Sequence, residues 1–167
     1  CRTRKVPLAV NVAQALGQVP FDVDGVDFAC GTSHKWLMAG YGLGFLYVRE
    51  GCIPQLTPKA SGWFAQADVD AMDVSRNVPS PTARRFQAGT PPVPNCYAAL
   101  AGLDIILQLG STAIETYVRE LTGRCMDRLL EAGCRLATPR EDSRRGPTVA
   151  ICSSNDVELT ARLAERN

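Results

Sequence analysis

Short apolar runs separated by small or polar residues fill the first fifty positions of the chain. The run from Val6 to Val10 is rich in β-branched residues and predicts a strand buried on both faces. Val26 to Gly31 predicts a second strand, and Gly42 to Glu50 predicts a third whose glycines allow a close backbone approach. The intervening "AQALGQVP" predicts a brief helix or turn. Apolar strands with short connections predict an α/β sheet.

The later part of the chain changes to a helical period. Asn95 to Leu109 is apolar nearly all round and predicts a buried helix. Ser111 is a candidate N-cap for a second helix, and Gly133 a candidate stop. Apolar residues at three-to-four spacing define the predicted inner face of this second helix: Ile114, Val118, Leu121, Cys125 and Leu129.

Two less periodic regions frame this helical part. Residues 51–94 carry prolines, glycines and aspartates without sustained periodicity, which predicts a long functional or mobile loop region. After the polar segment "TPREDSRRG", "PTVAICS" predicts a strand, and the last residues begin another helix. We place a domain boundary near residue 110: residues 1–110 form a sheet domain, and residues 111–167 form a bridging helix and the start of a smaller α/β domain.

Composition and charge narrow the class of protein. The chain is 46% hydrophobic and 21% charged, as in ordinary soluble globular proteins. Its net charge of +1 gives no reason to expect nucleic acid or a membrane surface as partner, and no apolar stretch approaches the ~20 residues of a membrane span. The pairs Arg84–Arg85 and Arg144–Arg145 do not extend into a basic patch, so we interpret them as solvated arginines.

The seven cysteines include no CxxC pair, and with a single histidine they predict no metal site. Their scatter through apolar segments predicts buried reduced thiols, and therefore a cytoplasmic location. The chain begins without methionine and stops inside a predicted helix, so we expect an internal piece of a longer polypeptide.

One lysine stands out chemically. Lys35, one of three lysines, follows a small-residue turn at the end of the second predicted strand. Thr32, Ser33 and His34 supply hydroxyl and imidazole groups that suit an anionic phosphate. The tryptophan and leucine that follow would bury the amine, which lowers the pKa of a lysine and makes it nucleophilic toward an aldehyde. These features suit a Schiff base with a phosphate-bearing cofactor, although such a lysine can also simply cap a strand.

The stretch "VNVAQALGQVPFDVDGVDFACGTSHKWLMAGYGLGFLYVRE" closely resembles the lysine-bearing segment of class V aminotransferase-like enzymes that depend on pyridoxal 5'-phosphate. This family includes cysteine desulfurases, kynureninases and isopenicillin-epimerase-like proteins. The later "RRFQAGTPPVPNCYAALAGLDIILQLG" resembles a second segment of the family, so the resemblance runs from about Val6 to about Val149. It implies the fold-type-I α/β architecture, with a mostly parallel sheet in a large domain over residues 1–110 and a truncated small domain over residues 111–167.

The resemblance also implies roles for individual residues. Lys35 matches the lysine that binds the cofactor aldehyde and moves protons at the substrate Cα. Thr32 and His34 match positions that contact the cofactor phosphate, and Gln14 matches the residue that hydrogen-bonds its phenolic oxygen. Thr90 matches a residue that reaches the phosphate in the partner subunit, which implies a homodimer with shared active sites. Taken alone, Gln14 and Thr90 are ordinary turn residues.

One position departs from the family. The aspartate that pairs with the pyridine nitrogen falls at Asn11, and no acidic residue precedes Asp22. A carboxylate keeps the ring nitrogen protonated, whereas asparagine can hydrogen-bond the nitrogen but cannot offset a positive charge. Three explanations stay open: chemistry that needs less carbanion stabilisation, an engineered substitution, or a degenerate site. Trp63 falls where the family has a loop tryptophan near the active site, and it can equally serve loop packing.

Three functional hypotheses follow. The first is a pyridoxal-phosphate-dependent enzyme that acts on an amino-acid-like substrate through a Lys35 Schiff base, with transamination, elimination or desulfuration as its outcome. The second is a non-catalytic relative that serves as a binding or dimerisation module, as Asn11 suggests. The third is a general anion-binding α/β domain. No cysteine lies where desulfurases carry their reactive thiol, and we expect Cys30, near Lys35, to belong to the core.

Overall fold

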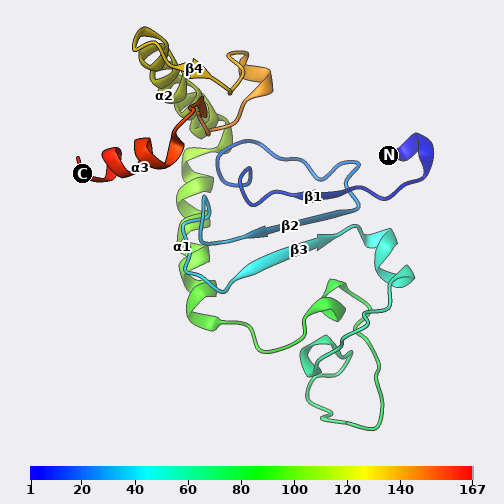
Figure 1. Cartoon of the computed structure of the whole chain (residues 1–167). Helices are drawn as coiled ribbons and strands as arrows, with labels where there is room; N and C mark the ends of the chain where they lie inside the picture. Colours follow the sequence, from blue (N-terminus) through cyan, green and yellow to red (C-terminus); the bar gives the residue numbers. More distant parts are fainter. Residues whose placement is uncertain (167) are drawn as a thin grey trace. The chain divides into compact units, whose positions relative to one another are not determined.

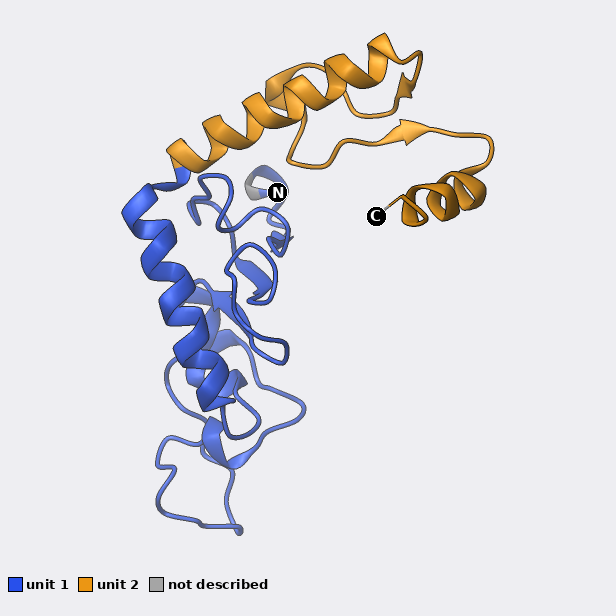
Figure 2. Ribbon diagram, turned by 90° about the vertical axis from the view of Figure 1, so that its left-hand side faces the viewer, with its two compact units in different colours: residues 1–111 blue, residues 112–167 orange. Residues whose placement is uncertain are grey.

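The computed structural model describes residues 1–166 of the chain. Two compact units divide it, residues 1–111 and residues 112–167 (Figure 2). The predicted assignment of these parts to a large and a small domain stays a prediction.

The first unit contains a three-stranded sheet in the order β1-β2-β3 (Figure 1). Its strands are β1 (Ala9–Asn11), β2 (Phe28–Thr32) and β3 (Gly44–Val48). β1 and β2 are parallel, whereas β3 returns antiparallel to β2. Residues 33–43 connect β2 to β3 without a helix, and such a short connection cannot return the chain for a parallel strand. The predicted α/β fold is confirmed.

All three predicted strands are present, but their bounds differ from the prediction. β1 begins at Ala9 and not at Val6, because Pro7 has no N–H for a ladder and the Leu8 N–H donates to the Asp27 carboxylate, at 2.8 Å. The segment after β1 forms turns and no helix. Leu16 N–H donates to Val12 O at 2.9 Å, and Gly17 then takes a φ of +98°, which ends any helical continuation.

A small core lies between the sheet and this turn. Val12, Val26 and Ala29 are buried, and partly buried hydrophobic residues pack against them: Leu8, Val10, Ala15, Leu16, Phe21, Phe45 and Tyr47. Burial of one such valine contributes roughly 1.5–3 kcal/mol to folding. The core thereby packs the segment after β1 against β2.

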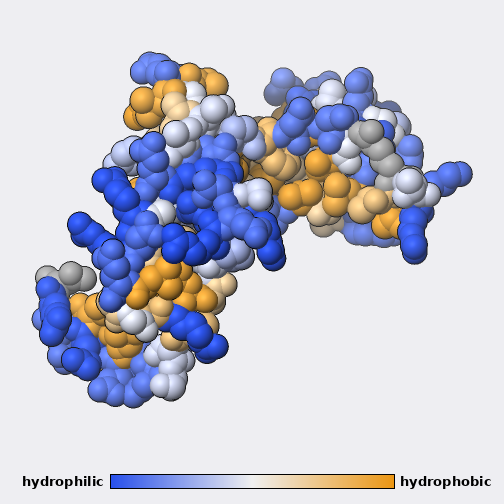
Figure 3. Space-filling view, turned by 90° about the horizontal axis from the view of Figure 1, so that it is seen from above, coloured by the Kyte–Doolittle hydropathy of each residue, from blue (hydrophilic) through white to orange (hydrophobic). Residues whose placement is uncertain are grey.

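Helix α1 (Val93–Leu109) begins two residues before the predicted start, since prolines are well accepted in a first helical turn. Its predicted full burial is wrong for this structure. Only Ala99, Gly102 and Ile106 are buried, and their spacing marks a single inward face. Apolar residues elsewhere on the helix are exposed: Val93, Tyr97, Leu100, Leu103, Ile105, Leu107 and Leu109. Hydrophobic side chains also reach the surface on the face drawn in Figure 3.

The region predicted as a loop, residues 51–94, contains no α-helix or strand before α1 begins at Val93. Three short 3-10 helices lie in it or overlap its start: Glu50–Gln55, Trp63–Ala65 and Ala83–Phe86. Arg85 ties this region together. Its Nη1 donates to Ile53 O at 2.8 Å and to Leu56 O at 3.0 Å, and its Nε donates to Ser80 O at 2.7 Å. The interpretation of Arg85 as a solvated arginine is therefore wrong.

The second unit is built on helix α2 (Ser111–Glu131). Gly133 follows it with a φ of +79°, as the predicted stop requires. A two-stranded antiparallel sheet joins β4 (Arg135–Leu136), which the pattern missed, to β5 (Ile151–Cys152) inside the predicted strand. Helix α3 (Asp156–Ala164) confirms the last predicted helix. Two further 3-10 turns complete the described chain, Arg2–Arg4 in the first unit and Asp142–Arg144 in the second.

The buried face of α2 is rotated from the predicted one. Thr122 and Met126 are buried, whereas Leu121 and Cys125 are exposed. Arg145 explains the shift, because its side chain is only 4% exposed and donates to Arg119 O at 3.1 Å and to the Thr122 hydroxyl. The loop that carries Arg145 thus covers this face. The prediction that Arg145 is solvated is therefore wrong.

The thiols are more exposed than predicted. Cys52 and Cys134 are half-buried, and the other five are exposed: Cys1, Cys30, Cys96, Cys125 and Cys152. On β2 the neighbouring Ala29 takes the core position, so strand alternation turns Cys30 away from the core. The predicted cytoplasmic location stays a prediction. In residues 1–166 no single helix has the length and apolar character of a membrane span, and only α1 and α2 taken together across their break meet that criterion.

Asp27 gives the fold a pH-dependent contact. The Leu8 N–H, and then Arg49, whose Nη2 lies 2.7 Å from the carboxylate, hold the pKa of Asp27 below its ordinary value. A lowered pKa stabilises the fold above the unfolded-state pKa, and this contribution is lost as the pH falls through the folded-state pKa.

Asp27→Asn should therefore flatten the loss of stability below about pH 4. Urea unfolding at a series of pH values measures the effect. Asp104→Asn is the matched control, because Asp104 is exposed and has no hydrogen bond or ion pair within the described chain. Equal slopes for wild type and Asp27→Asn would contradict the assignment.

Candidate active site

The turn that carries Lys35 is fixed by hydrogen bonds to the glycine-rich segment after it. Ser33 is buried, its N–H donates to Leu43 O at 3.0 Å, and its hydroxyl donates to the same carbonyl at 2.8 Å. Within the turn, Met38 N–H donates to Lys35 O at 3.0 Å and Ala39 N–H to Ser33 O at 2.9 Å. The small residues at positions 31–33 permit this tight path, and Lys35 itself is exposed.

Helix α1 supports the same turn from the side. A Cβ at Gly102 would lie 2.1 Å from Leu37 O, so only glycine permits this approach of helix and turn. Near the start of α1, the Asn95 amide donates to Tyr41 O. Figure 1 shows α1 beside the end of the sheet where β2 leaves it, in agreement with these contacts. The helix and the sheet core therefore hold the lysine turn between them.

The predicted burial of the Lys35 amine is wrong. Leu37 is buried, but its side chain packs toward Gly17, where its Cδ2 lies 3.2 Å from the position of an added Cβ. It therefore does not cover Lys35. The neighbouring His34 ring is half-buried and lies over Tyr41, with ring centroids 4.6 Å apart. This contact restrains the imidazole next to the amine.

Three other predicted residues, Asn11, Gln14 and Thr32, lie at or just after one edge of the sheet. Because β1 and β2 are parallel, with Asn11 opposite Cys30, Asn11 and Thr32 lie at the same carboxyl edge. Ligands of open α/β sheets bind outside this edge. Asn11 is exposed, and its Oδ1 accepts the Ala13 N–H at 3.0 Å. Gln14 is exposed in the turn after β1, three residues further along.

Thr32 has an unsatisfied hydroxyl. Its Oγ1 is buried and has no hydrogen-bond partner in the described part of the chain. Leaving a buried hydroxyl unpaired costs about 1–3 kcal/mol. A phosphate oxygen would accept this hydroxyl, and the Lys35 and His34 side chains follow it in the same turn. The residues present therefore fit an anionic group at this edge.

Sequence reasoning missed two residues that shape this edge. Gln18 is 2% exposed, and its Nε2 donates to Gln14 O at 3.0 Å, which holds the turn that carries Gln14. Asn95 holds the glycine-rich segment from α1. Both residues lie inside the segments that resemble the family, but the sequence indicates no role for either, because each acts only through the backbone that the fold brings beside it.

Thr90 is not joined to this edge. It is exposed in the segment before α1 and, among residues 1–166, forms no hydrogen bond. The structure thus brings Asn11, Thr32, His34 and Lys35 to one edge and leaves Thr90 outside the contacts that hold them.

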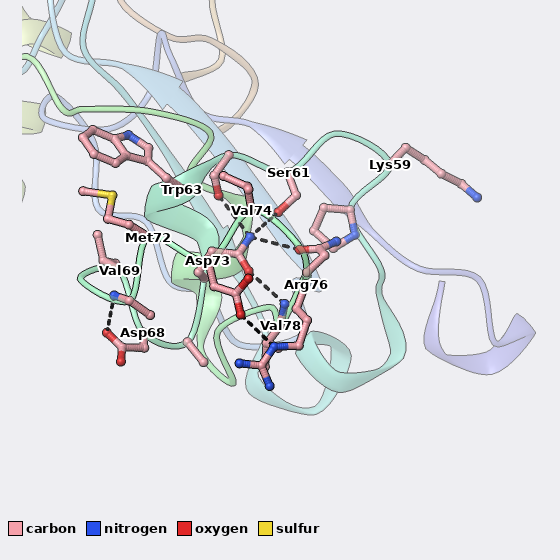
Figure 4. A pocket seen from close by; sticks show the side chains of 16 residues that line it. Lys59, Ser61, Trp63, Asp68, Val69, Met72, Asp73, Val74, Arg76 and Val78 are labelled. Atoms are coloured by element: carbon pink, nitrogen blue, oxygen red, sulfur yellow. Dashed lines mark hydrogen bonds and ion pairs between the residues drawn. The ribbon is translucent and has the colours of Figure 1, made fainter.

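A cavity of about 760 Å³ lies within the loop of residues 58–78 (Figure 4). Trp63 and Met72 line one side of it, whereas Lys59 points away. Gln66 closes the neck of the loop: its Nε2 donates to Asn77 Oδ1 at 3.0 Å and its Oε1 accepts the Val78 N–H at 2.8 Å. None of the predicted cofactor residues lines this cavity, so it is separate from the Lys35 edge.

The sequence matches the family described as Aminotransferase class-V over residues 1–163. The chain belongs to the class-V aminotransferase family. A curated relative, the uncharacterized aminotransferase YcbU of Bacillus subtilis (strain 168), is 35% identical over 162 residues, covering 95% of this chain and 42% of the relative. Kynureninase of Deinococcus radiodurans is 33% identical over 162 residues, covering 93% of this chain and 39% of that enzyme.

A solved structure agrees with the fold. The apo structure of cysteine desulfurase from Thermococcus onnurineus NA1 matches with a TM-score of 0.88 at 24% identity, covering 99% of this chain and 42% of that one. The fold-type-I architecture implied by the sequence is thereby confirmed. The chain spans about two fifths of the length of the curated relatives that it matches.

Class-V aminotransferases use pyridoxal phosphate. The carboxyl edge of β1 and β2 offers this cofactor an exposed primary amine, an unpaired hydroxyl at Thr32 and exposed amides at Asn11 and Gln14. The residues present therefore fit the cofactor. In residues 1–166, no group of three or more His, Cys, Asp or Glu side chains lies together as a metal site.

Gly102→Ala tests the support that α1 gives to this edge. Alanine ordinarily stabilises a helix by about 0.5–1 kcal/mol relative to glycine. Here the added methyl group meets Leu37 O, so we expect a net loss of roughly 1–3 kcal/mol in the free energy of unfolding. Chemical denaturation measures it. Gly146→Ala is the control, since an added Cβ there meets nothing within 4 Å, and a stabilised Gly102→Ala would exclude the close packing described.

Proposed function

We propose that this chain is part of a pyridoxal-phosphate-dependent enzyme that acts on an amino-acid-like substrate, with Lys35 forming a Schiff base with the cofactor aldehyde. One observation carries the proposal: an exposed lysine amine stands on a fixed turn beside an unpaired threonine hydroxyl, in a chain of the class-V family. When bound, this cofactor withdraws electron density from the substrate Cα and so weakens the bonds to that atom.

Each residue then has a chemical task. The Lys35 amine would hold the aldehyde carbon, with the aldehyde oxygen leaving as water. When the substrate amine takes its place, the freed Lys35 amine would take or return a proton at the substrate Cα. The Thr32 hydroxyl would donate to a phosphate oxygen, which gives this buried group the hydrogen-bond partner that it lacks. His34, restrained by Tyr41, donates an imidazole N–H to the same phosphate. Gln14 donates its amide to the phenolic oxygen and so orients the ring.

The proposed assembly is a homodimer in which Thr90 reaches the cofactor phosphate of the partner subunit. Two observations support this role. Thr90 is exposed and forms no hydrogen bond in the described chain, and the resemblance to the family implies a phosphate contact at this position. Trp63 is not assigned to this shared site, because its ring contacts Phe64 edge-on and lines the separate loop cavity.

The proposed reaction is defined by its class of substrate and not by its product. The curated relatives are named as an aminotransferase and a kynureninase, so the proposal extends only to an amino-acid-like substrate. The alternative of a non-catalytic binding or dimerisation module rests on Asn11 alone. The persistence of the lysine, the histidine and the unpaired hydroxyl at one edge favours the enzyme.

Mass spectrometry tests the role of Lys35. The intact protein, saturated with pyridoxal phosphate and reduced with borohydride, should carry the cofactor on the peptide that contains Lys35. Lys35→Arg should abolish the adduct, because a guanidinium keeps the charge but forms no stable imine. Lys5→Arg, the same exchange at an exposed lysine outside the site, should retain it. A folded wild-type protein without an adduct would overturn the proposal and leave the non-catalytic module or the anion-binding domain.

Thr32→Val tests the phosphate contact separately. Removal of one hydrogen bond to a charged group should weaken pyridoxal phosphate binding roughly tenfold or more. Binding of pyridoxal, which lacks the phosphate, should not change. Thr116→Val, a matched exchange on the exposed side of α2, should affect neither ligand. An equal loss for both ligands would assign Thr32 a structural role and no phosphate contact.

A further inference from the structure

The amide of Asn11 has a fixed polarity in this structure. Asn11 ends β1, and its Oδ1 accepts the N–H of Ala13 at 3.0 Å. This Asx turn starts the segment that leads to Gln14. A backbone N–H can be accepted only by the oxygen of the amide, so the bond decides which end of the side chain is engaged.

The other end of the amide is unused. Within the chain that the structure describes, Asn11 Nδ2 donates to no protein group, and the side chain is exposed at the carboxyl edge of β1 and β2. Asn11 therefore presents two N–H donors to a ligand at this edge, while its oxygen is already held by the backbone.

Asp22 and Asp27, acidic residues between β1 and β2, are both held by other groups of the first unit. Residues 1–21 contain no acidic residue. Asp22 Oδ1 accepts the N–H of Asp24 at 2.9 Å within its own turn. Asp27 lies at the start of β2, at the opposite end from Thr32, and is paired with Arg49. The titratable groups that follow Thr32 in its turn, His34 and Lys35, are basic.

We propose that Asn11 donates a hydrogen bond from Nδ2 to an unprotonated pyridine nitrogen of the cofactor. The inference rests on the proposed function, because it needs the cofactor at the Lys35 edge. A neutral pyridine nitrogen has a lone pair that accepts an N–H, whereas a protonated one carries an N–H that needs an acceptor. Both N–H donors of the amide are free, whereas one lone pair of its oxygen is already used by the Ala13 N–H, so the side chain favours the neutral form.

This assignment has a consequence for reactivity. A neutral ring withdraws electron density from the substrate Cα less strongly than a protonated ring. Of the three explanations that the sequence leaves open for Asn11, the inference selects the first: the site is intact and suited to a reaction that places little negative charge on the ring nitrogen. It does not require a degenerate site.

Nitrogen-15 NMR of the bound cofactor tests the inference. The intact protein is loaded with pyridoxal phosphate labelled at the pyridine nitrogen, and borohydride reduction of a parallel sample establishes attachment at Lys35. The wild-type signal should have the chemical shift of an unprotonated pyridine throughout the neutral pH range. Asn11→Asp should move it to the shift of a protonated nitrogen. Asn155→Asp, the same exchange at a helix N-cap where both residues cap well, should leave it unchanged.

Asn11→Ala supplies a second measurement. Loss of the donor should weaken cofactor binding roughly tenfold, with the nitrogen still unprotonated. A protonated nitrogen in the wild type, or equal affinities for wild type and Asn11→Ala, overturns the inference while the adduct at Lys35 upholds the proposed function. Absence of the adduct overturns the proposed function itself and the inference with it.

Discussion

The site depends on the way in which the backbone after β2 is held. Ser33 uses both its N–H and its hydroxyl on a single carbonyl, that of Leu43, so the chain leaving β2 is tied to the chain entering β3. Gly102 then lets α1 approach the carbonyl of Leu37. These contacts involve backbone and small side chains on both sides of Lys35. The Lys35 side chain is therefore exposed at the sheet edge while its backbone has a fixed position, as a covalent attachment point requires.

Residues with local consequences could be predicted from the sequence. The three strands follow from short apolar runs, and helix α2 from its periodicity and the glycine after it. The ordered motifs around Lys35 identified the family and the edge of the sheet where the cofactor residues gather. These features depend on neighbours within a few positions, so a linear pattern records them. The strand bounds were less accurate, because Pro7 and the Asp27 carboxylate decide where β1 begins.

Features that depend on distant partners could not be predicted. Arg85 binds carbonyls of Ile53 and Leu56, about thirty positions away, and Arg145 packs on α2 across a long loop. In sequence both look like ordinary charged surface residues. The same limit explains the errors at Lys35 and Cys30: whether a side chain is covered depends on which neighbour turns inward, and here Leu37 and Ala29 do. The burial of α1 was overestimated because an apolar composition does not say which face meets the sheet.

The hydrogen bonds of Gln66 separate residues 67–77, whose sequence can vary, from the strands and α1, whose sequence is constrained by packing. The Gln66 amide binds both arms of the loop, so residues 67–77 leave and re-enter the protein at nearly one point. Changes of length or composition beyond that point need not be transmitted to the strands or to α1. Related proteins are therefore free to diverge in this excursion while they retain the same lysine-bearing scaffold, and this loop offers a place where specificity could evolve without loss of the fold.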